Sequence, residues 1–175
     1  MDPFATLGVE RKFDVDLAKV EKTHRELSRT LHPDRFAGAG ASERRMALSR
    51  AADVNEAWRA VRDPIRRAES LFSLAGIAVG DTNEPKPDPE LLMDMLEQRE
   101  ALAEAKAGKD MKSVRALAAA MEARAKEAEA ALAEGFQDGA NDPRSLSALL
   151  PKLGELRYLR RFLDEVSAIE EELDV

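Results

Sequence analysis

The tripeptide His32-Pro33-Asp34, set between two strongly helical stretches, constrains the fold of this chain more than any other feature. In residues 16–31 the apolar side chains recur at spacings of three and four, the periodicity of one helix face. Pro33 disfavours helical geometry at His32, so this helix is expected to end there. The residues of its inner face are Leu17, Val20, His24, Leu27 and Leu31.

A second helix is expected after a loop rich in Gly and Ala at residues 35–41. Ser42 is its expected N-cap, and the helix should stop before Pro64. Its apolar face consists of Ala47, Ala51, Val54, Trp58 and Val61. The two stretches therefore predict an antiparallel helix pair with a proline-stiffened tip, where the Asp34 carboxylate can reach a guanidinium or amide of a partner.

The tip alone leaves two interpretations open, because turns often use Pro and Asp for their geometry. Its surroundings bear on the choice. A short helix over residues 2–9, closed by a glycine, precedes the pair, and Asn-Glu-Ala-Trp at residues 55–58 lies near its end. A stripe that is basic at most positions follows the first helix on the side away from its core. It consists of Lys19, Lys22, Arg25 or Glu26, and Arg29.

In this order, from Asp2 to Glu69, these elements resemble the J domain of the J-protein co-chaperones. The resemblance implies that the tip and the basic helix engage the ATPase unit of a DnaK-class chaperone and stimulate its ATP hydrolysis. The residues implied to bind that chaperone are His32, Pro33, Asp34, Lys19, Lys22, Arg25, Arg29 and Arg35.

Composition favours an all-α fold. Aromatic residues make up only 5% of the chain, and Ala, Leu, Glu and Arg, which are good helix formers, abound. No stretch alternates polar and apolar residues for long enough to predict a sheet. The apolar runs are too short to span a membrane, and the start lacks the layout of a signal peptide. We therefore expect a cytoplasmic protein with no membrane partner.

An enzyme using His32 and Asp34 as a catalytic pair is one alternative class. Such a pair needs a nucleophile and a third orienting group. The chain has two histidines, no cysteine and no glycine-rich phosphate loop, so we expect no enzyme and no cofactor. Without cysteine, the chain also cannot form disulfides or a thiolate metal site.

Charge divides unevenly along the chain. Residues 1–75 hold 14 Lys and Arg against 12 Asp and Glu, whereas the remaining 100 residues hold 13 against 22. Two such halves suit different partners. The acidic second half argues against nucleic-acid binding, and the basic stripe is too short to overturn that.

We predict a J domain at 1–76, a linker at 77–87 and a three-helix bundle at 88–175. The polar linker, with two prolines, suits an ordered connection and a hinge equally well. In the bundle, the first helix should start at Asp88-Pro89 and end near Ala107, with a restart after Asp110. Three further features are expected: a loop at 135–142, an interruption or restart at Pro151, and a final helix to about Leu173. The core candidates of these later helices are Val114, Leu117, Met121, Ala125, Ala128, Leu132, Leu156, Leu163, Val166 and Ile169.

The first bundle helix carries more apolar surface than a small bundle needs. Its core side should be Leu91, Met95 and Leu102. The apolar residues that then point elsewhere are Leu92, Met93 and Leu96, and Tyr158 lies off the stripe of the last helix. Either the core assignment is rotated, or these side chains cover the J domain, or they form an exposed protein-binding patch.

A second resemblance bears on this choice and spans almost the whole chain. Three segments resemble HscB-type co-chaperones of iron-sulfur cluster assembly, and the tip as His-Pro-Asp-Arg-Phe-Ala is close to the form of that group. The segments are residues 67–76, 91–100 and 156–159. The family more often has Phe at the position of Tyr158, and the Pro151 interruption departs from its pattern.

The resemblance implies an L-shaped all-α protein that recruits the iron-sulfur scaffold protein IscU to the specialised chaperone HscA. The residues implied to bind the scaffold are Leu92, Met93, Leu96, Glu97, Arg99, Glu100 and Tyr158. A general J protein serving another client is the alternative. General members carry glycine-rich or zinc-binding regions, which this sequence lacks.

Overall fold

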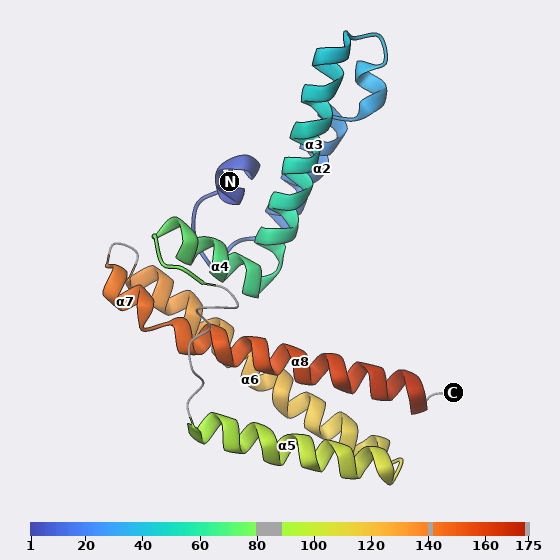
Figure 1. The fold of residues 1–175 in the computed structure, drawn as a ribbon, viewed down its shortest axis with the longest axis vertical. Helices are drawn as coiled ribbons and strands as arrows, with labels where there is room; N and C mark the ends of the chain where they lie inside the picture. The colour runs from blue at the N-terminus through green and yellow to red at the C-terminus, as the bar shows by residue number, and fades with distance from the viewer. Residues whose placement is uncertain (80–88, 140–141, 174–175) are drawn as a thin grey trace. The chain divides into compact units, whose positions relative to one another are not determined.

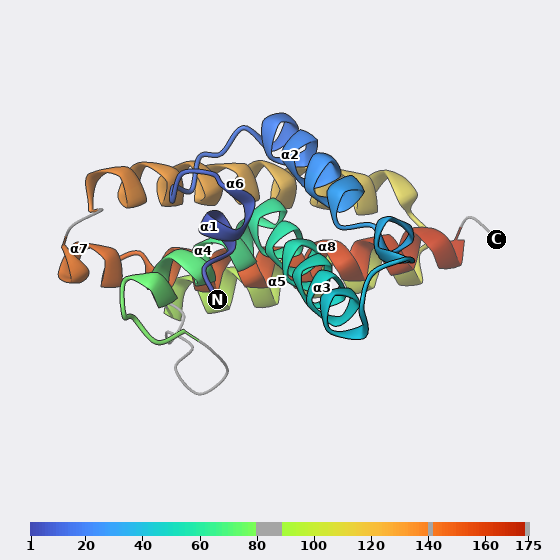
Figure 2. The same ribbon diagram turned by 90° about the horizontal axis from the view of Figure 1, so that it is seen from above.

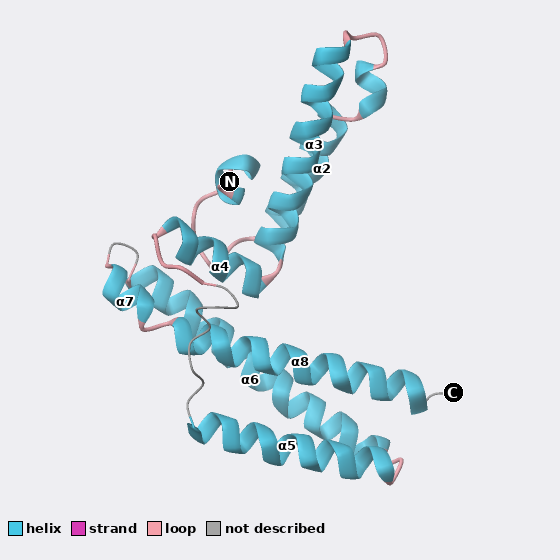
Figure 3. Ribbon diagram, viewed as in Figure 1, coloured by secondary structure: helices cyan, strands magenta, loops and turns pink. Residues whose placement is uncertain are grey.

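The computed structural model describes residues 1–79, 89–139 and 142–173, and within them the chain is helical with no strand (Figure 3). The expectation of an all-α fold is confirmed. The chain divides into two compact units, Met1–Ala78 and Val79–Val175 (Figure 1). Most of the expected linker and the Asp88 cap lie outside the described residues.

The N-terminal unit is a pair of long helices with shorter helices packed against it (Figure 2). Its elements are α1 (Pro3–Leu7), α2 (Leu17–Thr30), the 3-10 helix η1 (Pro33–Phe36), α3 (Ala41–Arg62) and α4 (Pro64–Leu74). Carboxylates cap three of them, since Asp2, Asp16 and Asp63 accept backbone N–H groups of the helices they precede. Gly8 closes α1 with a φ of 64°, a left-handed conformation that glycine adopts without strain.

The start of α3 differs from expectation. Gly40, not Ser42, is the N-cap, and it supplies no side-chain hydrogen bond. The extended backbone of Gly40 lets its carbonyl accept the Arg44 N–H at 3.0 Å, so the helix begins at Ala41. The expected loop is also partly helical, because Pro33 fixes the φ of the first residue of η1.

The core of the N-terminal unit joins α1, α2 and α3. Its buried residues are Phe4, Leu7, Val20, Val54, Ala57 and Val61. The expected face of α3 is largely confirmed: Ala47 is also buried, and Ala51 and Trp58 are half-buried. On α2, Leu17 is an exception, with an exposed side chain.

The C-terminal unit is a bundle of three long helices with one short helix. Each long helix runs antiparallel to the long helix before it in the sequence (Figure 1). Its elements are α5 (Pro89–Ala107), α6 (Met111–Asp138), α7 (Pro143–Ser147) and α8 (Leu150–Leu173). Asp110 and Asp142 cap α6 and α7, and the restart expected after Asp110 is confirmed. Pro151 falls in the first turn of α8, so the chain restarts there.

The expected loop at 135–142 is wrong over its first part, because α6 continues to Asp138. Gly135 does not break the helix. A Cβ at this position would collide with the side chain of Leu149, so the glycine allows the connection to α8 to pass close to α6. The close approach of Leu149, rather than a turn, explains why a glycine occupies this position.

The bundle core lies between α5, α6 and α8. Its buried residues are Met95, Leu102, Ala105, Val114, Met121, Leu159, Phe162, Val166 and Ile169. Leu117, Ala125 and Leu163 are only half-buried against it. Leu159 and Phe162 were not among the expected core residues, because the stripe predicted for α8 ran through Leu156 and Leu163.

Candidate functional site

The His-Pro-Asp tip is an exposed, locally braced turn. The ring of His32 accepts the backbone N–H of Asp34 at Nδ1, 3.3 Å away, and the same nitrogen lies 3.5 Å from Asp34 Oδ2. Pro33 opens η1 between them. The Asp34 side chain is 90% exposed. The turn is therefore held by its own backbone and ring, while the carboxylate faces solvent.

The basic stripe runs along the side of α2 opposite the buried Val20. At about 100° per residue, its members are centred about half a turn from Val20. All eight residues implied to bind the chaperone are exposed, in α2 and in the tip alike. Arg25 forms an ion pair with Glu21 one turn earlier on α2. The structure thus leaves the tip and the cations of α2 exposed.

A polar and aromatic contact connects α2 to α3 beneath this stripe. His24 Nε2 lies 3.0 Å from Asn55 Oδ1 and 3.3 Å from Ser28 Oγ. The ring of His24 stacks on Trp58, and the Arg62 guanidinium lies 5.9 Å from the centroid of a Trp58 ring. His24 was expected in register with the core, and its contacts with Asn55 and Trp58 show that it also connects the two helices.

A second exposed face lies on α5. The side chains of Leu92, Met93 and Leu96 are 41%, 60% and 53% exposed, whereas Met95 and Leu102 are 4% and 1% exposed. The assignment of the core side is therefore confirmed, and the rotated alternative is wrong. Glu97, Arg99 and Glu100 are exposed on the same half of the helix. We call these six residues of α5 (Leu92, Met93, Leu96, Glu97, Arg99 and Glu100) the apolar face.

Tyr158 differs from the other candidates. It is half-buried and packs against the bundle core, so it does not stand clear of it. The guanidinium of Arg161 lies 5.1 Å from its ring centroid. Leu159 and Phe162 belong to the buried face of α8, and their inward position places Tyr158 at the edge of the core.

The edge of α8 that carries Tyr158 lies beside α5. Arg99 Nε is 3.7 Å from Glu165 Oε2. Leu92, Leu96 and Arg99 lie on successive turns of α5, and Tyr158 and Glu165 lie two turns apart on α8. The ion pair therefore brings the two edges together, and Tyr158 borders the apolar face.

Arg124 on α6 connects the same two helices from inside the bundle. It bonds to Asp94 of α5 and, at 3.3 Å, to Glu155 of α8. Burial lowers the pKa of this guanidinium, but the hydrogen bond and charge of Asp94, and then of Glu155, outweigh burial and raise the pKa. Lys152 adds a second cation at 2.7 Å from Glu155.

The lowered pKa values belong to helix caps. The pKa of Asp110 is below its ordinary value because the Ser113 side chain donates a hydrogen bond to it, with the Ser113 N–H second. Ser145 lowers the pKa of Asp142 in the same way. Neither carboxyl lies at the tip or at the apolar face, so these shifts serve the helix ends.

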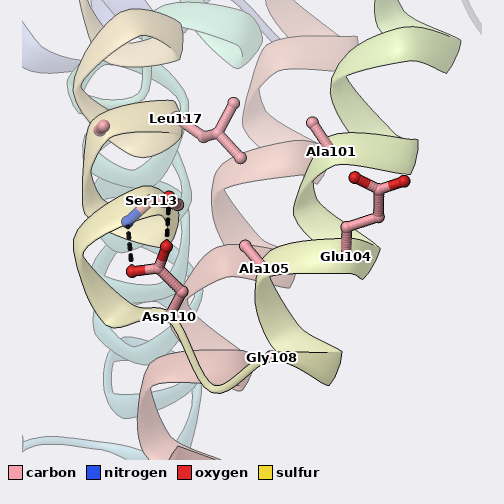
Figure 4. A pocket seen from close by; sticks show the side chains of 8 residues that line it. Ala101, Glu104, Ala105, Gly108, Asp110, Ser113 and Leu117 are labelled. Carbon is pink, nitrogen blue, oxygen red and sulfur yellow. Dashed lines mark hydrogen bonds between the residues drawn. The ribbon is translucent and has the colours of Figure 1, made fainter.

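Two of the cavities in the described part of the bundle are lined by no candidate binding residue. One, of about 610 Å³, lies at the turn between α5 and α6, with Ala101, Glu104 and Ala105 on one side and Asp110, Ser113 and Leu117 on the other (Figure 4). The other, of about 430 Å³, is bordered by Asp94, Arg124 and Glu155.

No group of three or more His, Asp and Glu that could hold a metal ion occurs among the residues that the structure describes. Over the same part of the chain, no helix is both long and apolar enough to span a bilayer.

Known proteins resemble this chain in sequence. The family model described as "HSCB C-terminal oligomerisation domain" matches residues 87–167. A relative from Paraburkholderia phymatum, named "Co-chaperone protein HscB homolog", is 32% identical over 171 residues, covering 98% of this chain and 95% of the relative. One of the same name from Cupriavidus taiwanensis is 38% identical over 141 residues, covering 81% and 80%.

Two solved structures resemble it as well. The chaperone HscB from Vibrio cholerae superimposes with a TM-score of 0.86 at 29% identity and covers 99% of each chain. The human co-chaperone protein HscB has a TM-score of 0.87 at 23% identity and covers 97% of this chain and 82% of its own, a likeness of fold.

Proposed function

Because this chain belongs to the HscB co-chaperone family, we propose that it stimulates ATP hydrolysis by a DnaK-class chaperone of the HscA type and delivers the iron-sulfur scaffold IscU to it. We assign chaperone engagement to residues 1–76 and scaffold binding to residues 88–175, joined by the linker at 77–87. Both steps are binding events in the cytoplasm, so the chain itself performs no chemistry. Iron-sulfur cluster assembly and transfer are the processes it serves.

The chaperone-binding part of the proposal rests on the exposed carboxylate of Asp34 on a braced turn. A carboxylate this exposed can form a charge-assisted bond to a guanidinium or amide on the chaperone. His32 and Pro33 hold that carboxylate in one direction, which lowers the entropy lost on binding. We assign the signal for ATP hydrolysis to this contact.

The cations of α2 supply steering. Lys19, Lys22, Arg25 and Arg29 are exposed on one side of a helix, and Arg35 follows on the tip. A row of like charges raises the rate of encounter with an acidic surface and orients the partner, an effect that salt weakens. The partner surface should therefore be acidic.

The apolar face supports the scaffold-binding part of the proposal. Three apolar side chains that are each more than two-fifths exposed are unusual on one short stretch of a helix, and such patches commonly bind protein. Glu97, Arg99 and Glu100 form a charged rim, the arrangement typical of binding sites that exclude water at the centre. We assign the scaffold contact to this face, with Tyr158 at its border.

A reconstituted ATPase assay tests the proposal. The purified chain, the chaperone and the scaffold of the same cell are combined, and phosphate release is measured with each component omitted in turn. We expect this chain to stimulate the chaperone, and the scaffold to add further stimulation only when this chain is present. A chain that binds neither protein, or that hydrolyses ATP alone, contradicts the proposal.

A pull-down from extract of the same cell tests the choice of client. The HscB-type function predicts recovery of both the iron-sulfur scaffold and its chaperone. Recovery of the chaperone with a different client would favour the general J-protein function instead.

A further inference from the structure

Residues 91–96 of α5 carry apolar side chains at five of six positions, and Asp94 is the one polar exception. Apolar residues therefore lie nearly all round this part of the helix. Hydrophobic burial is non-directional, so it distinguishes poorly between a rotation that buries Met95 and one that buries Leu92. Leu102 and Ala105, further along the helix, are buried on the side of Met95 and favour the observed rotation, but within residues 91–96 the selection must come from a polar contact.

Asp94 provides that selection. It lies two residues from Leu92 and two from Leu96, which at 100° per residue places it on the opposite side of the helix from both. On that side Asp94 bonds to Arg124. Gln98 Nε2 lies 3.4 Å from Oδ1 of the same aspartate. Rotating α5 by one residue would break the Arg124 bond and bring an apolar side chain to a half-buried cation. Leaving a partly desolvated charge without its partner is costly, so the observed rotation is favoured.

Arg124 also holds α8 in place. Its second nitrogen reaches Glu155, three residues before Tyr158, and Lys152 neutralises the remaining charge of that carboxylate. One guanidinium on α6 thus holds the two helices whose adjoining edges carry the apolar face and Tyr158 (Figure 1). A guanidinium suits this task because its planar fork donates to two acceptors at fixed angles.

Two further ion pairs between α5 and α8 are more exposed. Arg99 with Glu165 and Lys106 with Glu172 both lie at the surface, where ion pairs contribute little. Arg124 is 29% exposed at its side chain, so solvent screens its bonds less.

We propose that Arg124 is a positioning residue for scaffold binding: it selects the rotation of α5 that exposes Leu92, Met93 and Leu96, without touching the scaffold itself. The inference deepens the proposed function and rests on it for the identity of the partner. The rotational effect on α5 does not depend on any partner.

Thiol reactivity measures the rotation directly. The natural chain has no cysteine, so Leu92→Cys and Met95→Cys each introduce a single thiol. In the otherwise native chain, the thiol at position 92 should react with a thiol reagent far faster than the buried one at position 95. In an Arg124→Met background the two rates should converge. Arg115→Met is the matched control, because Arg115 is on the same helix, pairs with Glu170 of α8 rather than with α5 in the described part of the chain, and is 66% exposed.

Scaffold affinity is the second readout, taken by calorimetry at a temperature where each variant is folded. If α5 holds the exposed rotation only a tenth of the time in Arg124→Met, affinity falls about tenfold, since apparent affinity scales with the competent fraction. Arg124→Lys should fall between, because an ammonium lacks the fork. Stimulation of the chaperone without scaffold should stay at the native level in all three variants.

Three results would overturn the inference: unchanged thiol rates in Arg124→Met, native affinity in that variant, or equal losses in Arg115→Met. If the native chain fails to bind the scaffold at all, the proposed function fails instead. The thiol rates then still decide whether Arg124 selects the rotation of α5.

Discussion

The ring of His24 on α2 stacks on the indole of Trp58 on α3, with centroids 5.3 Å apart and planes 15° from parallel. The same histidine bonds to Asn55, one turn before Trp58. This contact joins the helix that carries the basic stripe to the helix behind it. It explains why a polar residue stands in register with an apolar face.

Replacing His24 should therefore loosen the helix pair. His24→Ala should lower the free energy of unfolding by about 1–2 kcal/mol, since it removes a stacking contact and a hydrogen bond. His24→Phe keeps the stacking and should recover part of the loss. Urea unfolding followed by fluorescence of Trp58, the only tryptophan of the chain, measures both, with Glu26→Ala as an exposed control on α2. Equal stability of His24→Ala and the native chain would refute this account.

Asp34→Asn should abolish stimulation of the chaperone ATPase while leaving stability within about 0.5 kcal/mol, as expected for an exposed surface position. The amide keeps the shape of the side chain but cannot supply the charge. Phosphate release at saturating concentration of the variant, with Asp53→Asn on α3 as control, provides the measurement. Normal stimulation by Asp34→Asn would remove the tip from the proposed mechanism.

Reversing the charge of the stripe should weaken chaperone engagement in a salt-dependent way. The double variant Lys22→Glu/Arg25→Glu should bind the chaperone more weakly at low salt, and the difference from the native chain should shrink as salt rises, because exposed charges are screened. Association rates measured over a salt series test this. A loss that is equal at every salt concentration would indicate damage to α2 rather than lost steering.

The apolar face should tolerate truncation without unfolding. Leu92→Ala/Leu96→Ala should cost far less than the roughly 2–5 kcal/mol per residue of a buried leucine, yet lose scaffold binding and the extra stimulation that the scaffold provides. Tyr158→Ala should lower the free energy of unfolding more than either leucine substitution, because the Tyr158 ring packs on the core. Thermal melts and scaffold titrations of each variant separate the two effects. A folded double variant that still binds the scaffold tightly would refute the site.

The helix caps predict how acid affects the C-terminal unit. The folded pKa of Asp110 lies below the ordinary value of 3.8, so this carboxylate contributes stability above that pH and loses it as the pH falls through its lowered folded pKa. Asp110→Asn should therefore be less stable than the native chain at pH 5, and the gap should narrow toward pH 2. Urea unfolding at several pH values, with the exposed Glu122→Gln of α6 as control, measures the gap. A gap that stays constant with pH would contradict the assignment.

Much of the fold is local enough to be predicted from the chain. The ends of α2 follow from Asp16 and Pro33 acting on their neighbours, and the structure has both ends within a residue of expectation, as it has the end of α5 at Ala107. The same locality explains the tip, where three consecutive residues make the turn and its bond. Two predictions were wrong for a different reason. Ser42 and Gly135 looked like a cap and a break, but Gly40 and the packing of Leu149 decided otherwise.

The sequence by itself determined the succession of helices, the exposed carboxylate of the tip and the surplus of apolar residues on α5, because each depends on neighbours along the chain. Only the tertiary structure decided that Tyr158 packs at the edge of the core and that His24 meets Asn55, 31 residues away. It also decided which side of α5 faces outward. Five apolar side chains in six positions permit several rotations, and the choice depends on Arg124, a cation 30 residues from Asp94. Periodicity describes a helix surface, but partners on other helices select which part of it is buried.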